Sequence, residues 1–195
     1  MPRPGLTSSR VVEEAGQLAD ELGLARLTLA GLAARLGVRQ PSLYKHIEGM
    51  DALQSSIAVR AKLELADTLA RSAVGRSRAV AISAMCHAYR EWAIAHPGRY
   101  ASTQRPSTPG DAQAEAADRS VIDVVTAVLA GYNLRDDDAI DATRALRSAL
   151  HGFVTLETTG GFGLPVDIDR SFDRLVHGLE VALDGWGDQV QRRAG

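Results

Sequence analysis

Through most of this chain, apolar residues recur at steps of three and four positions, the spacing that places side chains on one face of an α-helix. The first such stretch follows Ser8 and Ser9, either of which can cap a helix, and it ends at Gly23. Its apolar face consists of Val12, Ala15, Ala19 and Leu22. No stretch has the regular alternation that predicts a strand. The pattern therefore predicts an all-α protein.

Two short helices are predicted to follow the first. Thr28 can cap a helix that Gly37 ends. Pro41 is tolerated in the first turn of a helix but not in its interior, so it predicts the start of a third helix. We expect these three helices to form a compact head over residues 6–54.

A longer helix is predicted from Gly49 to about Val74, because this stretch lacks proline and carries leucine and isoleucine on one side. Glycine and proline separate the helices that come after it. These further helices are predicted at about Ser77–His96, Asp111–Gly131, Asp136–Thr159 and Asp169–Trp186. We expect residues 55–190 to form a second helical domain, with about nine helices in the whole chain.

Composition agrees with helices, because apolar residues make up 45% of the 195 residues and aromatic residues only 5%, whereas strands are rich in β-branched and aromatic residues. The single cysteine, Cys86, excludes an internal disulfide and a multi-cysteine metal site. No run of roughly 18 apolar residues and no apolar leader is present. We therefore expect a soluble, cytoplasmic protein without a membrane partner.

Charge is unevenly distributed along the chain, although the formal net charge is only −2. Between Leu24 and Ile47 the chain carries basic residues and no acidic one. The basic residues are Arg26, Arg35, Arg39 and Lys45. Acidic residues return at Glu48 and dominate the rest of the chain. A basic face on an acidic body is typical of a protein that binds nucleic acid through one region.

Residues 28–53 have the features of a helix-turn-helix. Ala33 is small where two helices cross, and Gly37 supplies the positive φ that the turn needs. Val38 and Leu43 can then pack the second helix onto the first. The side chains left to face a DNA groove or backbone are those of Gln40, Pro41, Ser42, Tyr44, Lys45 and His46.

These residue types suit DNA. Glutamine can bind the edge of adenine, serine can bind a base or a phosphate, and proline can contact a thymine methyl group. Tyr44, Lys45 and His46 can donate to phosphate oxygens. The alternative is a plain corner of two helices, in which Tyr44 and His46 are ordinary, partly buried side chains. The acid-free basic stretch favours DNA binding.

Residues 9–55 resemble the DNA-binding head of the TetR family of bacterial repressors. The shared positions are Thr28, Ala30, Ala33, Leu36-Gly37-Val38, Leu43-Tyr44-Lys45-His46-Ile47, Asp51 and Leu53. The resemblance implies that Thr28, Gln40, Ser42, Tyr44, Lys45 and His46 contact DNA.

Three positions depart from the family pattern. Ile47 replaces a phenylalanine, and Met50 replaces a lysine that would contact phosphate. Arg39 replaces a capping serine or threonine, which removes a cap worth about 1 kcal/mol and adds a candidate phosphate or guanine contact.

The resemblance also implies what the protein does. A member of this family is expected to bind a pseudo-palindromic, double-stranded DNA operator as a homodimer, to act as a repressor, and to be released by a small, largely apolar ligand. The alternative is a constitutive helical DNA-binding protein or scaffold without a ligand switch.

The last two predicted helices have wide apolar faces that can pair with a second copy of the chain. The predicted interface consists of Leu146, Leu150, Phe153, Phe172, Leu175, Leu179 and Leu183, and Gly152 would allow a close approach of helices. The alternative is that both faces pack inside one chain. The segments 146–157 and 160–163 resemble the His-Gly-containing C-terminal domain of one TetR branch, although Arg147 stands where that branch often has tryptophan.

A ligand pocket is implied by the family resemblance. Its candidate lining is Met85, Ala88, Tyr89, Trp92 and His151, because small residues beside methionine and aromatic residues can leave an apolar cavity. The alternative is that these residues form an ordinary helix core.

Nothing in the sequence favours an enzyme. The histidines have no metal-ligand spacing, and the glycines of residues 160–163 lack the strand and spacing of a phosphate loop. Ser148 and Ser171 lack the context of a nucleophile elbow. We expect no catalytic residues, no metal and no cofactor.

Overall fold

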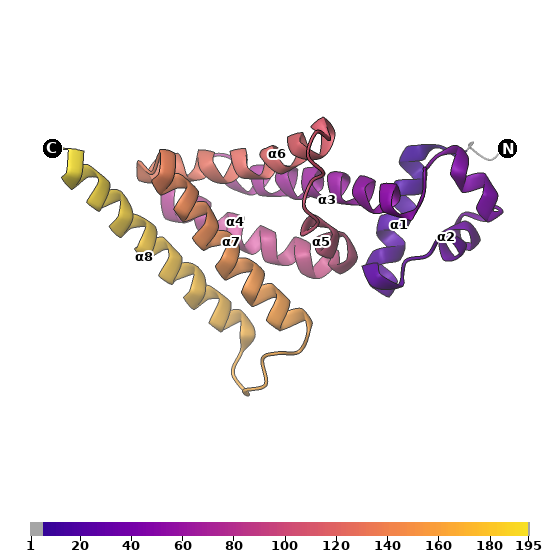
Figure 1. Cartoon of the computed structure of the whole chain (residues 1–195). Helices are drawn as coiled ribbons and strands as arrows, with labels where there is room; N and C mark the ends of the chain where they lie inside the picture. The colour runs from indigo at the N-terminus through magenta and orange to yellow at the C-terminus, as the bar shows by residue number, and fades with distance from the viewer. Residues whose placement is uncertain (1–5, 195) are drawn as a thin grey trace. The chain divides into compact units, whose positions relative to one another are not determined.

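The computed structural model describes residues 6–194, and the side chains as far as Trp186. Within these residues the chain is all-α, as predicted, with eight α-helices, three short 3-10 helices and no strand (Figure 1). In chain order the helices are α1 (Ser8–Leu22), η1 (Leu24–Arg26), α2 (Leu29–Leu36), η2 (Gln40–Lys45), α3 (Met50–Ala73), α4 (Arg78–Ala95), α5 (Pro97–Thr103), α6 (Ala112–Leu129), η3 (Ala130–Tyr132), α7 (Asp136–Thr158) and α8 (Ile168–Ala194). Among the described helices, none is long and apolar enough to cross a membrane.

The chain divides into two compact units. The head unit contains the residues up to Glu64 together with Ala95–Asp118, and the body unit contains Leu65–Ile94 together with the residues from Arg119 onward. The first division falls inside α3, so this helix contributes residues to both units. The predicted domain boundary after residue 54 stays a prediction.

The first helix begins one residue earlier than expected. Its cap is Thr7, whose Oγ1 accepts a hydrogen bond of 3.2 Å from the backbone N–H of Arg10, and not Ser8 or Ser9, which already lie within α1. Gly23 ends the helix, as predicted, with a φ of 89°.

Helix α5 is absent from the expected elements, because Pro97 and Gly98 were interpreted as a break between helices. Pro97 instead occupies the first turn of α5, where its missing N–H leaves no hydrogen bond unmade. Gly98 lies directly against α1: a Cβ atom at this position would be 2.1 Å from the carbonyl carbon and oxygen of Ala19. Glycine is therefore required for this close packing of α5 on α1.

Arg99, the next residue of α5, joins α1 and α3 inside the head unit. Its Nε donates to Asp20 at 2.7 Å, and its Nη1 donates to Glu64 at 2.8 Å. Its Nη2 donates to Nδ1 of His96 at 2.6 Å, so that ring nitrogen is unprotonated. All four side chains are partly buried, with exposed fractions between 12 and 31%. The arrangement requires a neutral His96 beside a charged Arg99.

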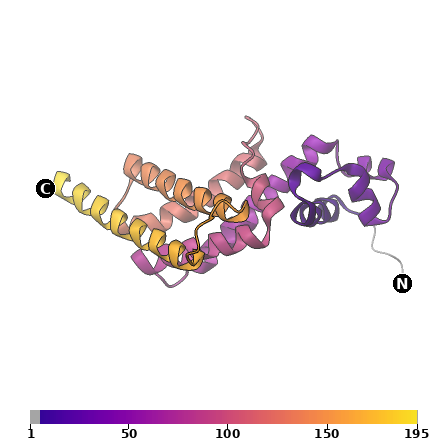
Figure 2. The ribbon, with the colours of Figure 1, turned by 90° about the horizontal axis from the view of Figure 1, so that it is seen from below.

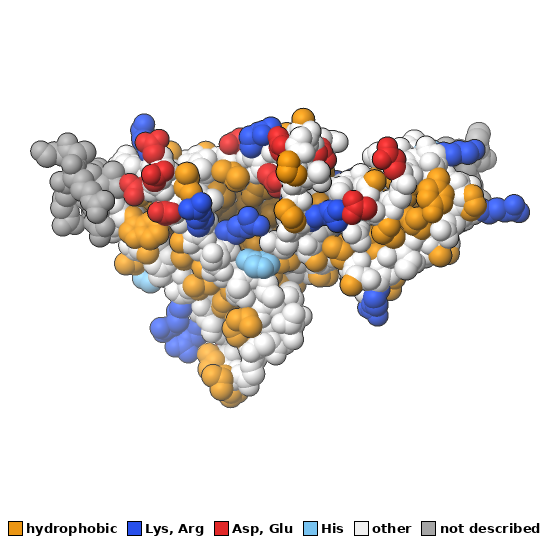
Figure 3. Space-filling view, in the orientation of Figure 1, with side chains coloured by type: hydrophobic (Ala, Val, Ile, Leu, Met, Phe, Trp, Pro, Cys, Tyr) orange, Lys and Arg blue, Asp and Glu red, His pale blue; other side chains and the backbone are white. Residues whose placement is uncertain are grey.

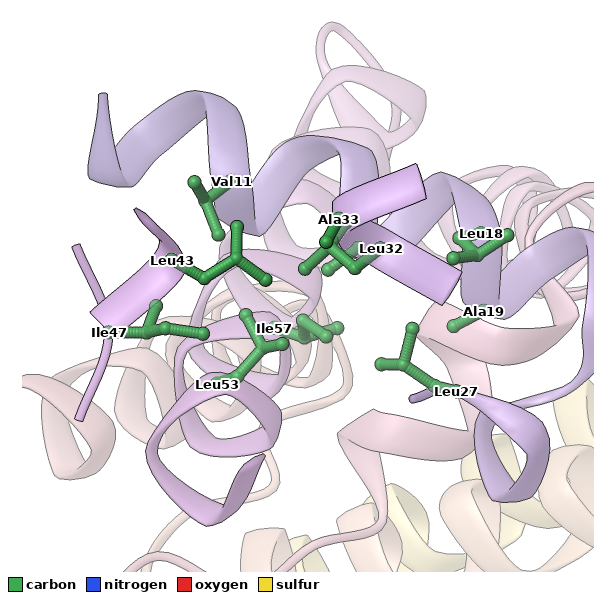
Figure 4. Packing of buried hydrophobic residues seen from close by; sticks show 11 residues of the cluster. Val11, Leu18, Ala19, Leu27, Leu32, Ala33, Leu43, Ile47, Leu53 and Ile57 are labelled. Atoms are coloured by element: carbon green, nitrogen blue, oxygen red, sulfur yellow. The ribbon is translucent and has the colours of Figure 1, made fainter. Parts of the chain in front are cut away.

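The short helices of the head unit pack around an apolar cluster drawn from α1, α2, η2 and α3 (Figure 4). In Figure 4, Leu43 of η2 points toward Val11 of α1 and toward Leu53 and Ile57 of α3. Each of these four side chains is at most 1% exposed. This cluster fixes where the short helix η2 sits in the head unit.

In the body unit, α7 and α8 form an antiparallel hairpin, because the loop between them reverses the chain (Figures 1 and 2). Arg90 of α4 holds the base of this loop from within the unit. Its guanidinium group binds Glu157 through two hydrogen bonds of 2.8 and 2.5 Å and Asp169 through one of 2.7 Å. It also lies over the rings of Phe172 and Phe153, 4.9 and 5.8 Å from their centroids. At the tip of the hairpin, hydrophobic side chains reach the surface (Figure 3), and Leu164 is 82% exposed.

Four of the seven predicted interface residues pack inside the single chain. Leu146, Leu150, Phe172 and Leu183 are at most 4% exposed, as in the alternative considered for these faces. Phe153, Leu175 and Leu179 are partly exposed. The four buried residues support the hairpin, and the interface assignment of the partly exposed ones stays a prediction.

We predict that Gly98→Ala lowers the free energy of unfolding by about 2–3 kcal/mol, because the new methyl group collides with the backbone of α1, which cannot rotate away. Gly163→Ala is the control, since a Cβ there meets open space. Urea denaturation of both variants measures the difference. Equal stability of the two variants would show that α5 does not approach α1 in this way.

We predict that His96 makes the protein less stable in mild acid. Burial of the ring, followed by the charge of Arg99, lowers the pKa of His96 below its ordinary 6.5. Below that pH the unfolded chain binds a proton that the folded chain does not, so the free energy of unfolding falls as pH falls.

Urea denaturation between about pH 7.5 and about pH 5.5 checks this sign. The variant His96→Gln, which keeps a hydrogen-bond acceptor but does not titrate, should lose stability less steeply than the unmodified protein. His177→Gln, at a side chain that is 77% exposed, should follow the unmodified protein. An unchanged slope in His96→Gln would contradict the prediction.

Candidate nucleic-acid interface

The turn between α2 and η2 forms as the sequence predicts. Thr28 caps α2, and its Oγ1 accepts a hydrogen bond of 3.1 Å from the N–H of Gly31. At the other end, Gly37 has φ 67° and ψ 31°, the left-handed conformation that glycine adopts without strain. The N–H of Val38 then donates to the carbonyl of Ala33 at 3.0 Å. These bonds end α2 and direct the chain into η2.

The third helix predicted from Pro41 exists, but it is a 3-10 helix of six residues. Pro41 lies in its first turn, as expected. Arg39 stands at the N-cap without a side-chain cap bond, so the missing serine or threonine is not replaced. The N–H of Ser42 donates instead to the carbonyl of Arg39 at 2.8 Å. The helix is therefore held mainly by what it packs against.

Packing divides the residues of this segment into two groups. Leu43 is fully buried and Ile47 is 8% exposed, so both point into the head core. The predicted DNA contacts all reach solvent. Thr28, Arg39, Gln40, Pro41, Tyr44 and Lys45 are exposed, and Ser42 and His46 are partly exposed. Tyr44 is 53% exposed, which is beyond the range of a partly buried side chain. This excludes the interpretation of Tyr44 as an ordinary, partly buried side chain.

The basic residues of this region divide in the same way. Arg35 is occupied inside the head unit: it binds Glu14 at 2.9 Å and Glu21 at 2.8 Å, and these hydrogen bonds raise its pKa above the ordinary value. Arg39 and Lys45 are exposed and have no carboxylate partner among the described residues. The charges of Arg39 and Lys45 are therefore available to a DNA backbone and that of Arg35 is not. Arg26 is also exposed and, among the described residues, donates only to the carbonyl of Leu22.

The predicted ligand contacts lie in the core of the body unit. Met85, Tyr89 and Trp92 are between 2 and 7% exposed, while Ala88 and His151 are partly buried. A cavity of about 340 Å³ in the same unit is lined by other residues, at the ends of α3 and α6 and the start of α4. Within the described part of the chain, no cluster of histidine, cysteine or acidic residues is arranged to hold a metal ion. The pocket assignment of the five residues stays a prediction.

Both units have relatives among known proteins. The family described as tetracyclin repressor-like, C-terminal domain, matches residues 82–179. An uncharacterized HTH-type transcriptional regulator of Mycobacterium tuberculosis is 36% identical over 180 residues, which cover 92% of this chain and 82% of the relative. The chain belongs to the TetR family. It is a transcriptional regulator and not an enzyme. The narrower resemblance to a His-Gly-containing branch is not confirmed by the family match.

Solved TetR structures share the fold. BioQ, solved with its natural double-stranded DNA operator, has a TM-score of 0.62 and 21% identity, covering 91% of this chain and 99% of that one. A TetR variant from Acinetobacter baumannii, solved in complex with minocycline, has a TM-score of 0.63 and 22% identity, covering 98% of this chain and 99% of that one. At these identities the likeness is one of fold.

Proposed function

We propose that this TetR-family regulator represses transcription by binding a pseudo-palindromic operator as a homodimer, and that a small ligand releases it. The observation that carries the proposal is the division of η2 and its flanks into a buried Leu43 and a continuous set of solvent-facing polar and basic side chains. The operator complex of BioQ, which shares the fold, supports a DNA-binding role for the head. A constitutive DNA-binding protein without a switch is the alternative.

The exposed residues divide by chemistry into two roles. Gln40 and Ser42 are suited to base edges, because amide and hydroxyl groups can both donate and accept. Pro41 offers an apolar contact to a thymine methyl group. Lys45 and Tyr44 are suited to phosphate oxygens, which accept hydrogen bonds from any donor and carry no sequence information. Arg39, Thr28 and His46 join the second group.

Helices α7 and α8 support a homodimer through the faces opposite their buried leucines. Gly178, Ala182 and Gly185 recur at helical spacing on α8, and a Cβ atom on either glycine would meet no described atom within 4 Å. Gly152 on α7 is equally open. Glycine inside a helix costs about 1 kcal/mol relative to alanine, and no contact within the chain requires it here. A second copy packed closely on these faces accounts for it.

Exposed apolar residues accompany these small positions. Leu156 on α7 is 48% exposed, and Val181 and Trp186 on α8 are 59 and 37% exposed. On a surface, such residues beside a stripe of small ones fit a helix–helix interface. We therefore assign the homodimer contacts to these side chains, with the partly exposed Leu175 and Leu179 at the edge.

The ligand switch draws support from the fold of the body unit. The TetR variant with this fold was solved with minocycline bound, and the body unit of this chain contains a cavity. A ligand that prefers the state with low operator affinity shifts the protein toward that state, and linkage then requires the operator to weaken ligand binding by the same factor.

We predict that Lys45→Ala weakens binding to every duplex and reduces the slope of log affinity against log salt by about 0.9 for each chain. Arg35→Ala removes the same charge from the same head, yet it should leave the slope unchanged and reduce stability, because Arg35 binds Glu14 and Glu21. Gln40→Ala should relax base preference. Fluorescence anisotropy over a salt series, with a duplex selected from a random pool, measures all three variants. A Lys45→Ala protein with altered base preference and an unchanged slope would refute the division of roles.

We predict that Gly178→Arg converts a dimer into a monomer, because a long charged side chain would occupy the face of α8 that meets the second copy. The position is open within one chain, so helix content should be retained. His177→Arg, one residue away and 77% exposed, is the control and should remain dimeric. Sedimentation at micromolar concentration distinguishes the two. A Gly178→Arg protein that stays dimeric would place the interface elsewhere.

A further inference from the structure

The cavity of about 340 Å³ in the body unit opens where α3 and α6 end and α4 begins. Its apolar wall consists of Ala70, Ala73, Ala81, Val124, Ala127 and Val128. The cavity is open to solvent, because Val74, Arg76 and Ala127 of its lining are exposed, and its volume lies near the lower end of the range of about 300–1,000 Å³ for small-ligand sites. The cavity therefore accommodates a compact ligand that stays partly in contact with solvent. Alanine and valine make no directional bonds, so they suit a hydrocarbon part.

One side of the cavity is basic. Arg76 and Arg78, with Ser77 between them, form the turn from α3 to α4 and belong to the lining. Arg76 donates to the carbonyl of Ser72 at 2.7 Å and meets no carboxylate among the described residues. Its positive charge is therefore not neutralised by a neighbour in the described part of the unit. An anionic ligand group would supply that partner.

Arg78, at the rim of the cavity, has a strained backbone conformation. Its φ is 50°, a left-handed value that residues other than glycine rarely adopt. Its guanidinium carbon lies 5.2 Å from the ring centroid of the buried Tyr132, and its Nη2 binds Asp184 at 2.5 Å. The Arg78–Asp184 pair is about half exposed on both sides, and exposed pairs of this kind are weak. A ligand carboxylate can therefore replace Asp184 at little cost.

We propose that this cavity binds a small organic anion with an apolar tail, of the chemical class of a medium-chain carboxylate. The tail lies among the alanines and valines, and the anionic group lies between Arg76 and Arg78. A flat aromatic carboxylate of similar volume shares this chemistry. The regulatory meaning of the site rests on the function proposed above, whereas ligand binding itself does not.

Isothermal titration calorimetry with decanoate, below its micelle concentration, tests the proposal on the full chain without DNA. Decanoate should bind once per chain. Decanol, with the same tail and no charge, should bind about fivefold more weakly, which is the upper range for an exposed charge pair. Equal binding of decanoate and decanol would overturn the assignment of the anionic group, and no binding of either would overturn the cavity as a ligand site.

Matched variants separate the tail from the charge. Ala127→Trp fills the cavity from an exposed position and should abolish decanoate binding. Ala116→Trp, at an exposed position of the same helix outside the lining, should leave it unchanged. Thermal unfolding of both variants confirms that they are folded. Decanoate binding that survives Ala127→Trp would show that the tail lies elsewhere.

The charge is tested by Arg76→Gln, which should bring decanoate affinity closer to that of decanol, with Arg78 still in place, and leave decanol unaffected. Arg71→Gln, an exposed arginine of α3 outside the lining, is the control. An equal loss in the two variants would overturn the role of Arg76, because it would reflect net charge alone. Adding decanoate to the operator complex then tests regulation separately. Binding without a change in operator affinity would leave the site standing and refute the ligand switch.

Discussion

The helix that we propose to face DNA is too short to fold by itself. Isolated helices shorter than about 12–15 residues are marginal in water, and η2 has six residues, in the less favourable 3-10 geometry and without a side-chain cap. Its shape therefore depends on Leu43, which is fully buried between α1 and α3, and on the left-handed turn at Gly37. Once these two positions are set, the side chains on either side of Leu43 can only face outward. The packing of the head core therefore positions the side chains that we propose to contact DNA.

Packing in the head unit also determines which basic side chains are left without a carboxylate partner. Arg35 lies in an acid-free stretch of sequence, but in the folded head it meets Glu14 and Glu21 of α1, so its charge stabilises the packing of α2. Arg39 and Lys45 lie beyond the turn, where α1 offers no acid among the described contacts. Part of the basic stretch is thus occupied in the structure of the head and part is left for the proposed DNA contacts, and only tertiary packing separates the two.

Much of this could be predicted from local rules. The period of apolar residues predicted the long helices. Thr28, Gly37 and Pro41 predicted the turn, because helix capping and left-handed backbone conformation depend on single residues. Helix α5 was missed although Pro97 obeys the same rule as Pro41, since seven residues carry too few apolar positions to show a period. The closeness of Gly98 to Ala19 depends on two segments far apart in sequence, and no local pattern reports it.

The apolar faces and the cavity show a different kind of limit. An amphipathic helix indicates that one face is buried, but not whether its own chain or a second copy buries it. Leu146 and Phe172 are buried by their own chain. The open glycines of α8 can be recognised as a separate face only in the structure, where the apolar face of the helix is already buried. A cavity forms where several helices leave space between them, so no local sequence pattern predicts it. Alanines such as Ala70 and Ala127, which line it, look like ordinary helix formers in the sequence.

The size and exposure of the cavity also limit what a ligand bound there can do. A ligand shifts an equilibrium only by the difference between its affinities for the two states, and a tenfold change in operator affinity requires about 1.4 kcal/mol. At about 340 Å³ the cavity is near the lower end of ligand sites, and its arginines are exposed, so each charge contributes at most about 1 kcal/mol. Together the two charges therefore contribute at most about 2 kcal/mol, which covers a tenfold shift but not the ~5.5 kcal/mol of a nearly complete switch. A nearly complete switch would require the apolar tail to favour one of the two states as well.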